Sequence, residues 1–467
     1  MFKRKWSALP ADPEFPSDLK GLGYFINKDD EIRSIENEDN YFNFFISRNM
    51  RVCDRQRFAM NQAIQDEIHA RLLDLGLRKL FLPASPGVAS QPKLPIFASA
   101  DIAPKSRVVL IFGETHQDLG VLAHRVLGRV GGIDKGSLVS VVRALGRKRC
   151  SPFDDAAPGI ILANMGELLW WPRGGRTLSR SAFAWAPMRS AAHAGNYVDP
   201  TLNRVPGNET PAAHVKYIFE NIVPMFVNPS AGLDVIALGD GAEVVQSYLN
   251  CDRVWELVGG RLNAFASVGG QFPYQDITCD GLRKFMRDRA RAYVPSTEPL
   301  GLILAGPLGN PHTTTFTSLG CPVFSAGEPQ HVETLFIACY PTVLDWLQEV
   351  ADTLPENRPY RNAVFTVVYS DAVDGSNDWT DWTGDNGDDA TGETENHEED
   401  NASTGASAGE LKIVTRDNVL EIGIIDGEEP TQKEVGEVEQ IGGEQKQYVL
   451  RPKRRGSDGR DPEVGKD

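Results

Sequence analysis

The amino-acid sequence predicts an α/β protein: a doubly wound, mostly parallel sheet with helices on both faces, followed by a disordered acidic C-terminal tail. Two patterns predict the sheet. Short apolar runs alternate with longer segments of helical periodicity, and the runs are apolar throughout, as in strands that are buried on both faces. A change in composition predicts the tail, because acidic and small polar residues replace apolar ones after residue 370.

The elements are expected in a regular order. Residues 1–53 mix aromatic and charged side chains and are expected to form an arm that packs on the body. A helix is predicted over 54–76, because Asp54 can cap it, its apolar residues share one face, and Gly76 ends it. Strands are then predicted at 108–112, 160–163, 233–238, 264–268, 302–305 and 323–325. Helices are predicted between and after them at 118–128, 136–147, 211–226, 241–249, 281–294 and 330–351.

The charged residues divide the chain into a neutral body and an acidic tail. The whole chain carries 48 Lys and Arg against 64 Asp and Glu, and residues 371–467 hold 26 of these acids and 10 of these bases. The body is expected over 54–354, with a linker over 355–370. A neutral body lacks the excess of Lys and Arg that neutralises phosphates, so a protein that encloses nucleic acid with a uniformly basic surface is excluded.

The tail has two parts. Residues 371–410 contain 13 acids and no Lys or Arg, and they are expected to be disordered because they cannot bury enough apolar surface to offset chain entropy. Residues 411–467 are expected to form a tail of low order with one basic cluster, made of Arg451, Lys453, Arg454 and Arg455. This cluster is interpreted as a nuclear import signal or, alternatively, as a patch that folds back on the acidic tail. We expect the protein in nucleus and cytoplasm, favouring the nucleus.

Several classes of protein are excluded by what the chain lacks. It has no run of about 18–20 apolar residues, so no membrane-spanning helix is expected. Its six cysteines are scattered without a CxxC pair, which argues against a zinc site or a disulfide framework and for reduced thiols in the cytosol or nucleus. We expect neither a metal nor a cofactor.

One segment has the local pattern of a catalytic turn. From Leu233 to Val245 a buried strand runs into a glycine turn and then a helix, which is the context of the nucleophile elbow of α/β-hydrolases. The nucleophile position is Gly239, with Gly241 as a small flanking residue, and Asp240 stands one residue too late. Glycine has no side chain with which to attack a substrate, so the elbow is expected to be degenerate.

Two further loops stand where a hydrolase would place catalytic groups. His331 follows a late strand and is a candidate general base, although a histidine at the surface or at a helix start is the favoured interpretation; Glu328 is a candidate to orient it. In the loop after an early strand, where oxyanion donors would stand, Glu114 would repel an oxyanion. With His116 and Asp118 it fits no named metal motif, so a polar loop is expected.

Spaced along residues 1–352, about three quarters of the chain, several segments together resemble the Argonaute-binding (Arb-type) domain family. They are Leu22-Gly23-Tyr24-Phe25-Ile26-Asn27 with Glu31-Ile32-Arg33, Asn43-Phe44, the Asp54–Leu75 helix, Ile111-Phe112-Gly113, the Gly239 elbow, and Ser325-Ala326-Gly327 with His331. The resemblance implies an α/β-hydrolase-like fold. One fungal branch of the family is a subunit of the Argonaute siRNA chaperone complex, and related domains are fused to class II histone deacetylases.

The resemblance implies that the partner is Argonaute or a subunit of the chaperone complex, with a histone deacetylase as a further candidate. It also implies that the protein acts in siRNA-directed heterochromatin silencing. Some relatives look as though they keep a serine at the elbow, and Gly239 departs from them. We therefore expect a non-catalytic interaction subunit. The alternative is an esterase-like hydrolase in which His331 is the base and Asp240 or a bound water attacks.

Two sets of residues are candidates for binding. Arg283, Arg287 and Arg291 lie four apart on a predicted helix and either contact RNA or an acidic partner, or form a solvated face, which is the favoured interpretation; direct RNA binding stays open. Trp379 and Trp382 resemble the tryptophan motifs that flexible proteins insert into Argonaute pockets. Only two residues separate them, so we expect them to fill one pocket and not two.

Overall fold

A computed structural model describes residues 8–84, 92–193, 195–309, 318–353, 360–367 and 411–413. These residues fall into two units, one holding the described residues up to Asn362 and one holding those after it. The expectations for the acidic segment at 371–410, for Trp379 and Trp382, and for the basic cluster at 451–455 lie outside the described residues.

The first unit is built on a nine-stranded sheet with the order β12-β13-β11-β10-β9-β5-β6-β4-β3. From β6 to β13 in this order all neighbours are parallel, whereas β3, β4 and β12 are antiparallel to theirs. The strands are β3 (Leu77–Leu82), β4 (Leu94–Ser99), β5 (Arg107–Phe112), β6 (Gly159–Ala163), β9 (Gly232–Leu238), β10 (Leu262–Val268), β11 (Ala290–Val294), β12 (Ile303–Ala305) and β13 (Val323–Ser325). The predicted fold class is confirmed: this is a mixed, mostly parallel α/β-hydrolase-like sheet.

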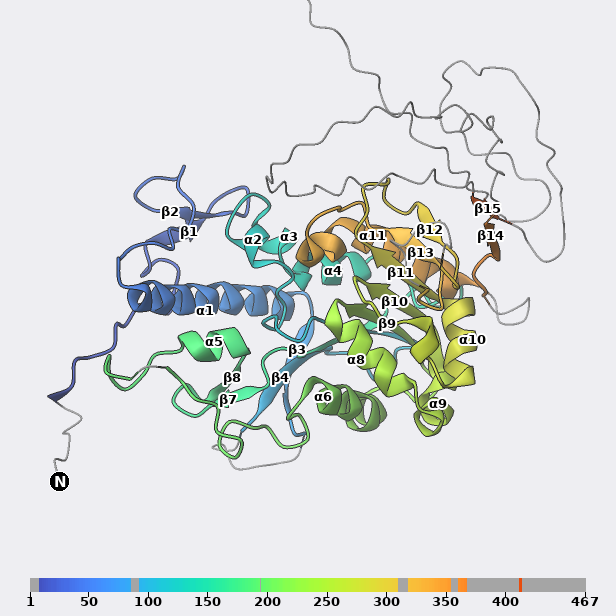
Figure 1. Cartoon of the computed structure of the whole chain (residues 1–467), viewed down its shortest axis with the longest axis horizontal. Coiled ribbons are helices and arrows are strands. Elements are labelled where there is room, and N and C mark those ends of the chain that lie inside the picture. The colour runs from blue at the N-terminus through green and yellow to red at the C-terminus, as the bar shows by residue number, and fades with distance from the viewer. Residues whose placement is uncertain are drawn as a thin grey trace, which may run out of the picture. The chain divides into compact units, whose positions relative to one another are not determined.

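Helices cover both faces of this sheet (Figure 1). On one face lie α1 (Met50–Asp74), α4 (Leu138–Leu145) and α11 (Leu335–Asp352), and on the other α6 (Pro211–Tyr217), α8 (Asp240–Leu249) and α10 (Asp280–Arg289). With both faces covered, the central strands are buried from end to end; all six residues of β5 are buried. Uniformly apolar runs such as Val108–Phe112 therefore form strands here without any alternation of polar residues.

Shorter helices complete the unit. Five of them lie in the connections: α2 (His124–Leu127), α3 (Gly132–Lys135), α5 (Arg180–Trp185), α7 (Val223–Phe226) and α9 (Asp252–Val258). The predicted helix over 211–226 is confirmed as a continuous run in which a π-helical turn joins α6 to α7. The Thr210 side chain accepts a hydrogen bond from the Ala213 N–H, and Pro211 takes the first helical position, as the sequence predicted.

Three predicted helices differ from the structure. α1 begins four residues before Asp54, and its cap is Asn49, whose side chain accepts a hydrogen bond from the Arg51 N–H at 3.1 Å. Of the helix predicted over 118–128, only α2 is helical. The rest of that segment is a loop, in which the Leu119 N–H donates to the Glu167 side chain and not to a helical carbonyl. The helix predicted over 281–294 ends at Arg289, and the rest is β11, which the pairing with β10 and β13 draws into the sheet.

Several strands were not predicted. β3 and β4 extend the sheet at one edge, and two small hairpins, β1 (Tyr24–Ile26) with β2 (Ile32–Ser34) and β7 (Leu169–Trp171) with β8 (Arg176–Leu178), stand outside it. β3 has the mixed sequence Leu-Arg-Lys-Leu-Phe-Leu and lacks the continuous apolar signal of the central strands, and each strand of the two hairpins has only three residues, too few to show a periodic pattern.

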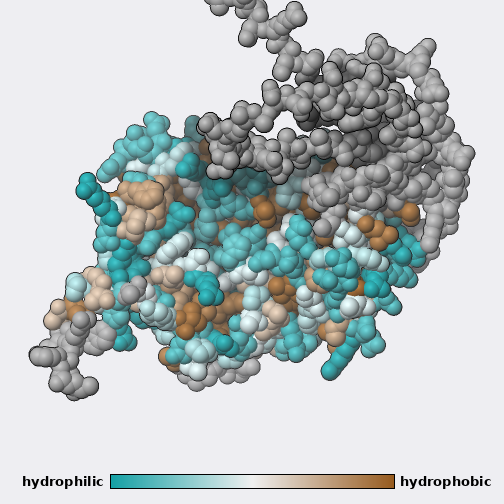
Figure 2. Space-filling model, in the orientation of Figure 1, coloured by the Kyte–Doolittle hydropathy of each residue, from teal (hydrophilic) through white to brown (hydrophobic). Residues whose placement is uncertain are grey.

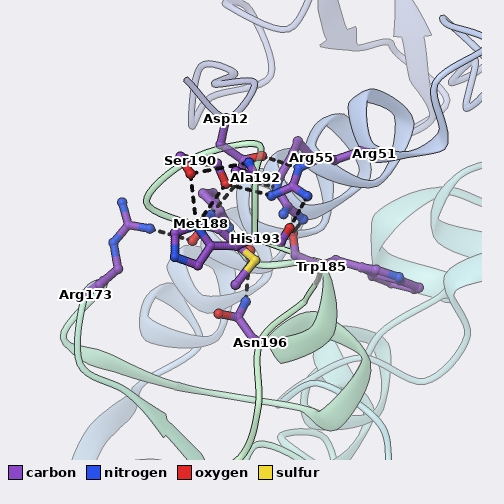
Figure 3. Close-up of polar contacts among 12 residues, drawn as sticks. Asp12, Arg51, Arg55, Arg173, Trp185, Met188, Ser190, Ala192, His193 and Asn196 are labelled. Atoms are coloured by element: carbon purple, nitrogen blue, oxygen red, sulfur yellow. Dashed lines mark hydrogen bonds and ion pairs between the residues drawn. The ribbon is translucent and has the colours of Figure 1, made fainter. Parts of the chain in front are cut away.

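The arm is tied to α1 by a buried carboxylate, as Figure 3 shows. Asp12 pairs with Arg51 and, at 2.7 Å, with Arg55, and it accepts a hydrogen bond from the Met188 N–H at 2.7 Å. Arg55 also donates to the Trp185 carbonyl at 2.6 Å. One acid thus joins three segments that are distant in the sequence, and every group in the cluster has a partner.

The second unit contains one described pair of strands. β14 (Phe365–Val367), inside the segment expected to be a linker, pairs antiparallel with β15 (Leu411–Ile413). In the part of the chain that the structure describes, no helix is long and apolar enough to cross a membrane.

The described surface is mixed in character. On the face that Figure 2 shows, brown apolar groups are scattered among teal hydrophilic ones. The large exposed apolar side chains come from separate parts of the chain, such as Phe45, Phe153, Leu257 and Leu308. Scattered exposure of this kind is normal for a globular surface and does not by itself mark a docking site.

Candidate functional site

The turn between β9 and α8 has the geometry of a nucleophile elbow. Gly239 adopts φ 50° and ψ −133°, and its N–H donates to the Val268 carbonyl at 2.8 Å. A side chain is strained in this conformation, which is why an elbow stores strain at its central residue. Behind the turn, a Cβ placed on Gly241 would stand 2.1 Å from the Gly113 carbonyl oxygen, so the loop after β5 packs directly on α8.

Glu114 fills the space that a nucleophile would occupy. A Cβ placed on Gly239 would lie 2.7 Å from Glu114 Oε1 and 2.9 Å from its Cγ. The other oxygen, Oε2, lies 3.2 Å from His116 Nε2. Burial raises the pKa of Glu114, and the nearby carboxylates of Asp240 and Glu333 raise it further, although His116 lowers it. The elbow therefore faces a carboxyl group and not a hydrogen-bond donor.

Asp240 is engaged in holding the same loop. Its carboxylate accepts a hydrogen bond from the Thr115 N–H at 2.8 Å and another from the Thr115 hydroxyl. Both oxygens are thus used to tie the loop after β5 to the first turn of α8, where a negative charge is favourable. This N–H, in the loop where a hydrolase supplies an oxyanion donor, already has an acceptor.

His331 stands at the start of a short 3₁₀ turn, Val332–Thr334, after β13. Its N–H donates to Glu328 Oε1 at 3.2 Å, and its carbonyl accepts a hydrogen bond from the Thr334 hydroxyl at 3.0 Å. Val332 and Glu333, but not His331, line the pocket at the elbow. This arrangement matches the interpretation of His331 as a residue at a helix start.

The pocket lies at the carboxyl ends of the central strands and has a volume of about 30 Å³. Three carboxylates line it, those of Glu114, Asp118 and Glu333. Its apolar walls come from Leu119, Val121, Leu122, Leu138, Ala163, Met165, Leu238, Val268, Val332 and Phe336. In the described part of the chain no three His, Cys, Asp or Glu side chains are grouped as metal ligands. The pocket is small; its polar side holds these three acids and Gln117, and the rest of its wall is largely apolar.

A buried polar network fixes the pocket loop at Leu119. Glu167 Oε2 accepts a hydrogen bond from the Leu119 N–H at 3.2 Å, and His69 Nε2 lies 3.1 Å from the Leu119 carbonyl. Burial, together with the charge of Lys79, lowers the pKa of His69 to about 3, so the ring is neutral. Nε2 then donates to Leu119, while Nδ1 accepts from Lys79 Nζ at 2.9 Å.

Glu167 is the centre of this network. It accepts hydrogen bonds from Gln65 Nε2 at 2.9 Å and from Asn164 Nδ2 at 3.0 Å, in addition to the bond from Leu119. Burial and the nearby Asp118 raise the pKa of Glu167 to about 7. This network was not predicted from the sequence. The signal that was present is a pair of polar residues, Gln65 and His69, one turn apart on the buried side of α1.

The three candidate arginines do not share a face. Arg283 and Arg287 lie on α10 and pair with Asp280 at 2.6 Å and Asp288 at 2.9 Å. Arg291 lies on β11, where its guanidinium packs 4.8 Å from the Phe324 ring centroid, 5.0 Å from that of Trp346, and donates to the Tyr360 hydroxyl at 2.9 Å. The predicted stripe is wrong, because the strand turns Arg291 into the fold.

Comparisons with solved structures give weak likenesses to hydrolases. A bacterial heroin esterase matches at 13% identity over 46% of this chain and 54% of the esterase, with a TM-score of 0.20. Poly(aspartic acid) hydrolase-1 from Sphingomonas sp. KT-1 matches at 10% identity over 59% of this chain and 98% of that one, with a TM-score of 0.27. Carboxyl esterase 2 from the mycorrhizal fungus Tuber melanosporum matches at 10% identity over 60% and 87%, with a TM-score of 0.28. Likenesses at this level carry no argument about activity.

No curated protein matches the chain. A family model for the Arb2 domain matches residues 15–300, which run from the arm through the elbow to the end of β11. The match covers more than half of the chain and includes Gly239 and the loop of Glu114 that packs on it, whereas Ser325-Ala326-Gly327 and His331 lie beyond the matched residues. The family resemblance in the sequence is confirmed: this chain belongs to the Arb2 domain family.

Proposed function

We propose that this domain is a non-catalytic, hydrolase-like protein-interaction module. The observation that carries the proposal is the elbow itself. Gly239 holds the backbone conformation of a nucleophile but has no side chain, and the Glu114 carboxyl group stands in the space where the nucleophile would be. Covalent catalysis at an elbow requires a nucleophile on the turn.

The electrostatics support the same proposal. Acyl transfer places negative charge on an oxyanion, which hydrogen-bond donors aimed at the reacting centre must stabilise. Here three carboxyl groups, of Glu114, Asp118 and Glu333, line the pocket; the Gln117 amide beside them donates to Glu114, and Asp240 accepts the hydrogen bond of the Thr115 N–H. A developing oxyanion would meet like charge, so the site opposes the transition state as well as lacking its nucleophile.

A chemical test separates this proposal from the esterase-like alternative. The full-length protein is treated with a fluorophosphonate probe and assayed with p-nitrophenyl acetate, beside an authentic serine esterase. We expect no covalent labelling and no hydrolysis above the buffer rate. Stoichiometric labelling, or hydrolysis that is lost in an Asp240→Asn or His331→Ala variant, would favour the hydrolase.

Membership of the Arb2 domain family supports a proposal about the partner of this module and the process in which it acts. We propose Argonaute or another subunit of an siRNA chaperone complex as its partner, with a histone deacetylase as the second candidate, in heterochromatin silencing. Affinity purification of the full-length chain with mass spectrometry tests this, with and without nuclease. We expect Argonaute in the nuclease-treated sample. Recovery that depends on intact RNA would instead favour direct RNA binding.

Two proposals concern the tail. Trp379 and Trp382 are proposed to anchor Argonaute, so replacing both with alanine is expected to lower its recovery; unchanged recovery would reject this role. The basic residues Arg451, Lys453, Arg454 and Arg455 are proposed to direct nuclear import. Deletion of 451–455 from a fluorescent fusion is expected to shift the signal to the cytoplasm, and an unchanged distribution would leave the fold-back interpretation.

A further inference from the structure

A second pocket lies between the arm, α1 and α2, apart from the elbow, and has a volume of about 20 Å³. Apolar side chains form part of its wall, among them Ile32 and Phe42 of the arm and Met60 of α1. Its polar side holds Arg57 and Asn61 of α1 and His124 of α2. No acid of the described chain lines it, so it differs in charge from the pocket at the elbow, which three carboxylates line.

Arg57 differs from the other arginines of α1 in having no acid partner. Arg51 and Arg55 both pair with Asp12 (Figure 3), and Arg71 forms ion pairs with three acids. Within the described residues Arg57 donates no hydrogen bond, and burial lowers its pKa without any neighbouring acid to raise it. A guanidinium is nevertheless protonated at neutral pH. Arg57 is therefore a cation whose charge the described part of the domain does not balance.

The two terminal nitrogens of Arg57 are the donors that a ligand can reach. Nε is completely buried, so it is not available, whereas Nη1 and Nη2 are neither completely buried nor bonded to a described group. Aromatic rings flank the guanidinium, since Cζ lies 5.6 Å from the ring centroid of Phe42 and 6.0 Å from that of Phe44. The fork formed by Nη1 and Nη2 matches the two oxygens of a carboxylate.

Asn61 is a second polar side chain without a partner in this pocket. It follows Arg57 by one turn on the same face of α1 and is only 8% exposed. Its side-chain amide has no hydrogen-bond partner among the described residues, yet neither amide atom is completely buried. An amide in this position is unfavourable unless a ligand bonds to it, so Nδ2 is a further donor beside the fork of Arg57.

Size and surroundings limit the ligand. A volume of about 20 Å³ holds roughly one or two water-sized groups, which suits the two oxygens of a carboxylate better than the four of a phosphate. Beside the pocket, the ring of Phe45 packs edge-on against Phe44 with their centroids 4.9 Å apart. Phe45 is 73% exposed and Ile46 is 42% exposed, so apolar residues that flank a carboxylate in a peptide would find an apolar surface there.

We propose that the pocket of Arg57 and Asn61 binds the side-chain carboxylate of an acidic peptide segment in a partner protein. The terminal nitrogens of Arg57 donate to the carboxylate oxygens, Asn61 Nδ2 donates to one of them, and an apolar neighbour of the acid contacts Phe45. The ligand supplies the negative charge that the described part of the domain does not give to Arg57. The inference goes beyond the proposed function, because this pocket lies apart from the elbow. A free small carboxylate shares the chemistry and is the other source of such a group.

The test measures binding to the full-length protein by ligand-observed NMR. The probes are the acetylated and amidated tripeptide Leu-Glu-Leu and acetate, and the neutral controls are the tripeptide Leu-Gln-Leu and acetamide. We expect the Glu peptide to bind at least about tenfold more tightly than the Gln peptide, and more tightly than acetate. An Arg57→Gln variant is expected to remove the preference for the acid. Arg149→Gln, which changes an exposed arginine outside the pocket, is expected to keep it.

Three results would overturn the inference. They are equal binding of the Glu and Gln peptides, tighter binding of inorganic phosphate than of either carboxylate, and binding of acetate as tight as that of the Glu peptide, which would assign the pocket to a free carboxylate. If Arg57→Gln does not fold, Asn61→Asp takes its place. Its carboxylate, one turn from Arg57, competes for the guanidinium and repels the ligand, so binding of the Glu peptide is expected to weaken about tenfold. Covalent labelling by the fluorophosphonate probe reports on the elbow alone, so this inference and the proposed function can fail separately.

Discussion

Buried charged side chains are paired differently at the two ends of the central strands. At the amino end, Arg107 at the start of β5 pairs with Asp234 of β9 at 2.6 Å, and both side chains are almost completely buried. The guanidinium also donates to the carbonyls of Leu347 at 2.8 Å and Arg149 at 2.9 Å. At the carboxyl end, Glu114 is buried beside the carboxylates of Asp240 and Glu333, which together with burial raise its pKa.

The difference separates structure from function. A buried charge that serves the fold is fully paired, because an unpaired one would cost more than the fold can offset. At the other end, like charges that lie close together are unfavourable to the isolated domain.

The largest effect is expected from breaking the complete pair. Arg107→Ala leaves the buried carboxylate of Asp234 without its cation, and we expect the free energy of unfolding to fall by about 4 kcal/mol in urea denaturation. The matched control is Arg149→Ala, which removes an exposed pair with Asp352 at the same end and should cost less than about 1 kcal/mol. Equal costs would contradict the distinction between complete burial and surface pairing.

The carboxyl end is expected to be sensitive to acid. His214 accepts a hydrogen bond from the Asn164 N–H at 3.1 Å, just after β6, and burial lowers its pKa to about 3. The ring is thus neutral in the folded state while the unfolded chain binds a proton below about pH 6.5. Its contribution is complete above pH 6.5 and is lost as the pH falls toward 3, amounting to about 3 kcal/mol at pH 4.

A variant isolates this histidine. His214→Gln keeps a donor and an acceptor but does not titrate, so the difference in unfolding free energy between pH 7 and pH 4 should shrink by about 3 kcal/mol. The measurement is urea denaturation at both pH values. A difference that stays as large as in the wild type would show that His214 is not the acid-sensitive group.

A smaller effect is expected at the elbow. Gly239→Ala places a methyl group against Glu114 and forces a strained backbone, so it should destabilise the fold by about 2 kcal/mol. In a Glu114→Ala background the steric part disappears, and a double-mutant cycle should give a coupling of about 1 kcal/mol. Additive costs would mean that the Glu114 side chain does not occupy the nucleophile's space.

The smallest effect has the opposite sign. Burial and neighbouring acids raise the pKa of Glu114, so the folded state favours the protonated carboxyl group. The stability that this protonated group contributes at low pH is lost as the pH rises through the pKa of the folded state. Glu114→Gln, which resembles the protonated form, should therefore raise the free energy of unfolding at pH 7 and leave it nearly unchanged at pH 4. A variant that is less stable at pH 7 would show that Glu114 is compensated within the domain.

The sequence predicted the framework well where the signal is local and repeated. Continuous apolar runs marked the central strands, and the strand–glycine–helix pattern marked the elbow at Gly239. The prediction failed where pairing with strands distant in the sequence determines the structure. Ala290–Val294 follows a helix without a break in periodicity, yet pairing with β10 and β13 makes it a strand. Arg291 consequently left the predicted surface stripe and packs between two aromatic rings.

By itself, the sequence determined that the chain has a neutral α/β body and an acidic tail, that it resembles the Arb-type family, and that its elbow carries no nucleophile. These follow from composition and from short patterns, which neighbouring residues along the chain specify. Only the tertiary structure decided what stands over Gly239. The loop with Glu114 and Asp118, the turn with Glu333 and the network around Glu167 come from separate segments, and their meeting depends on the register of strands that no local pattern records.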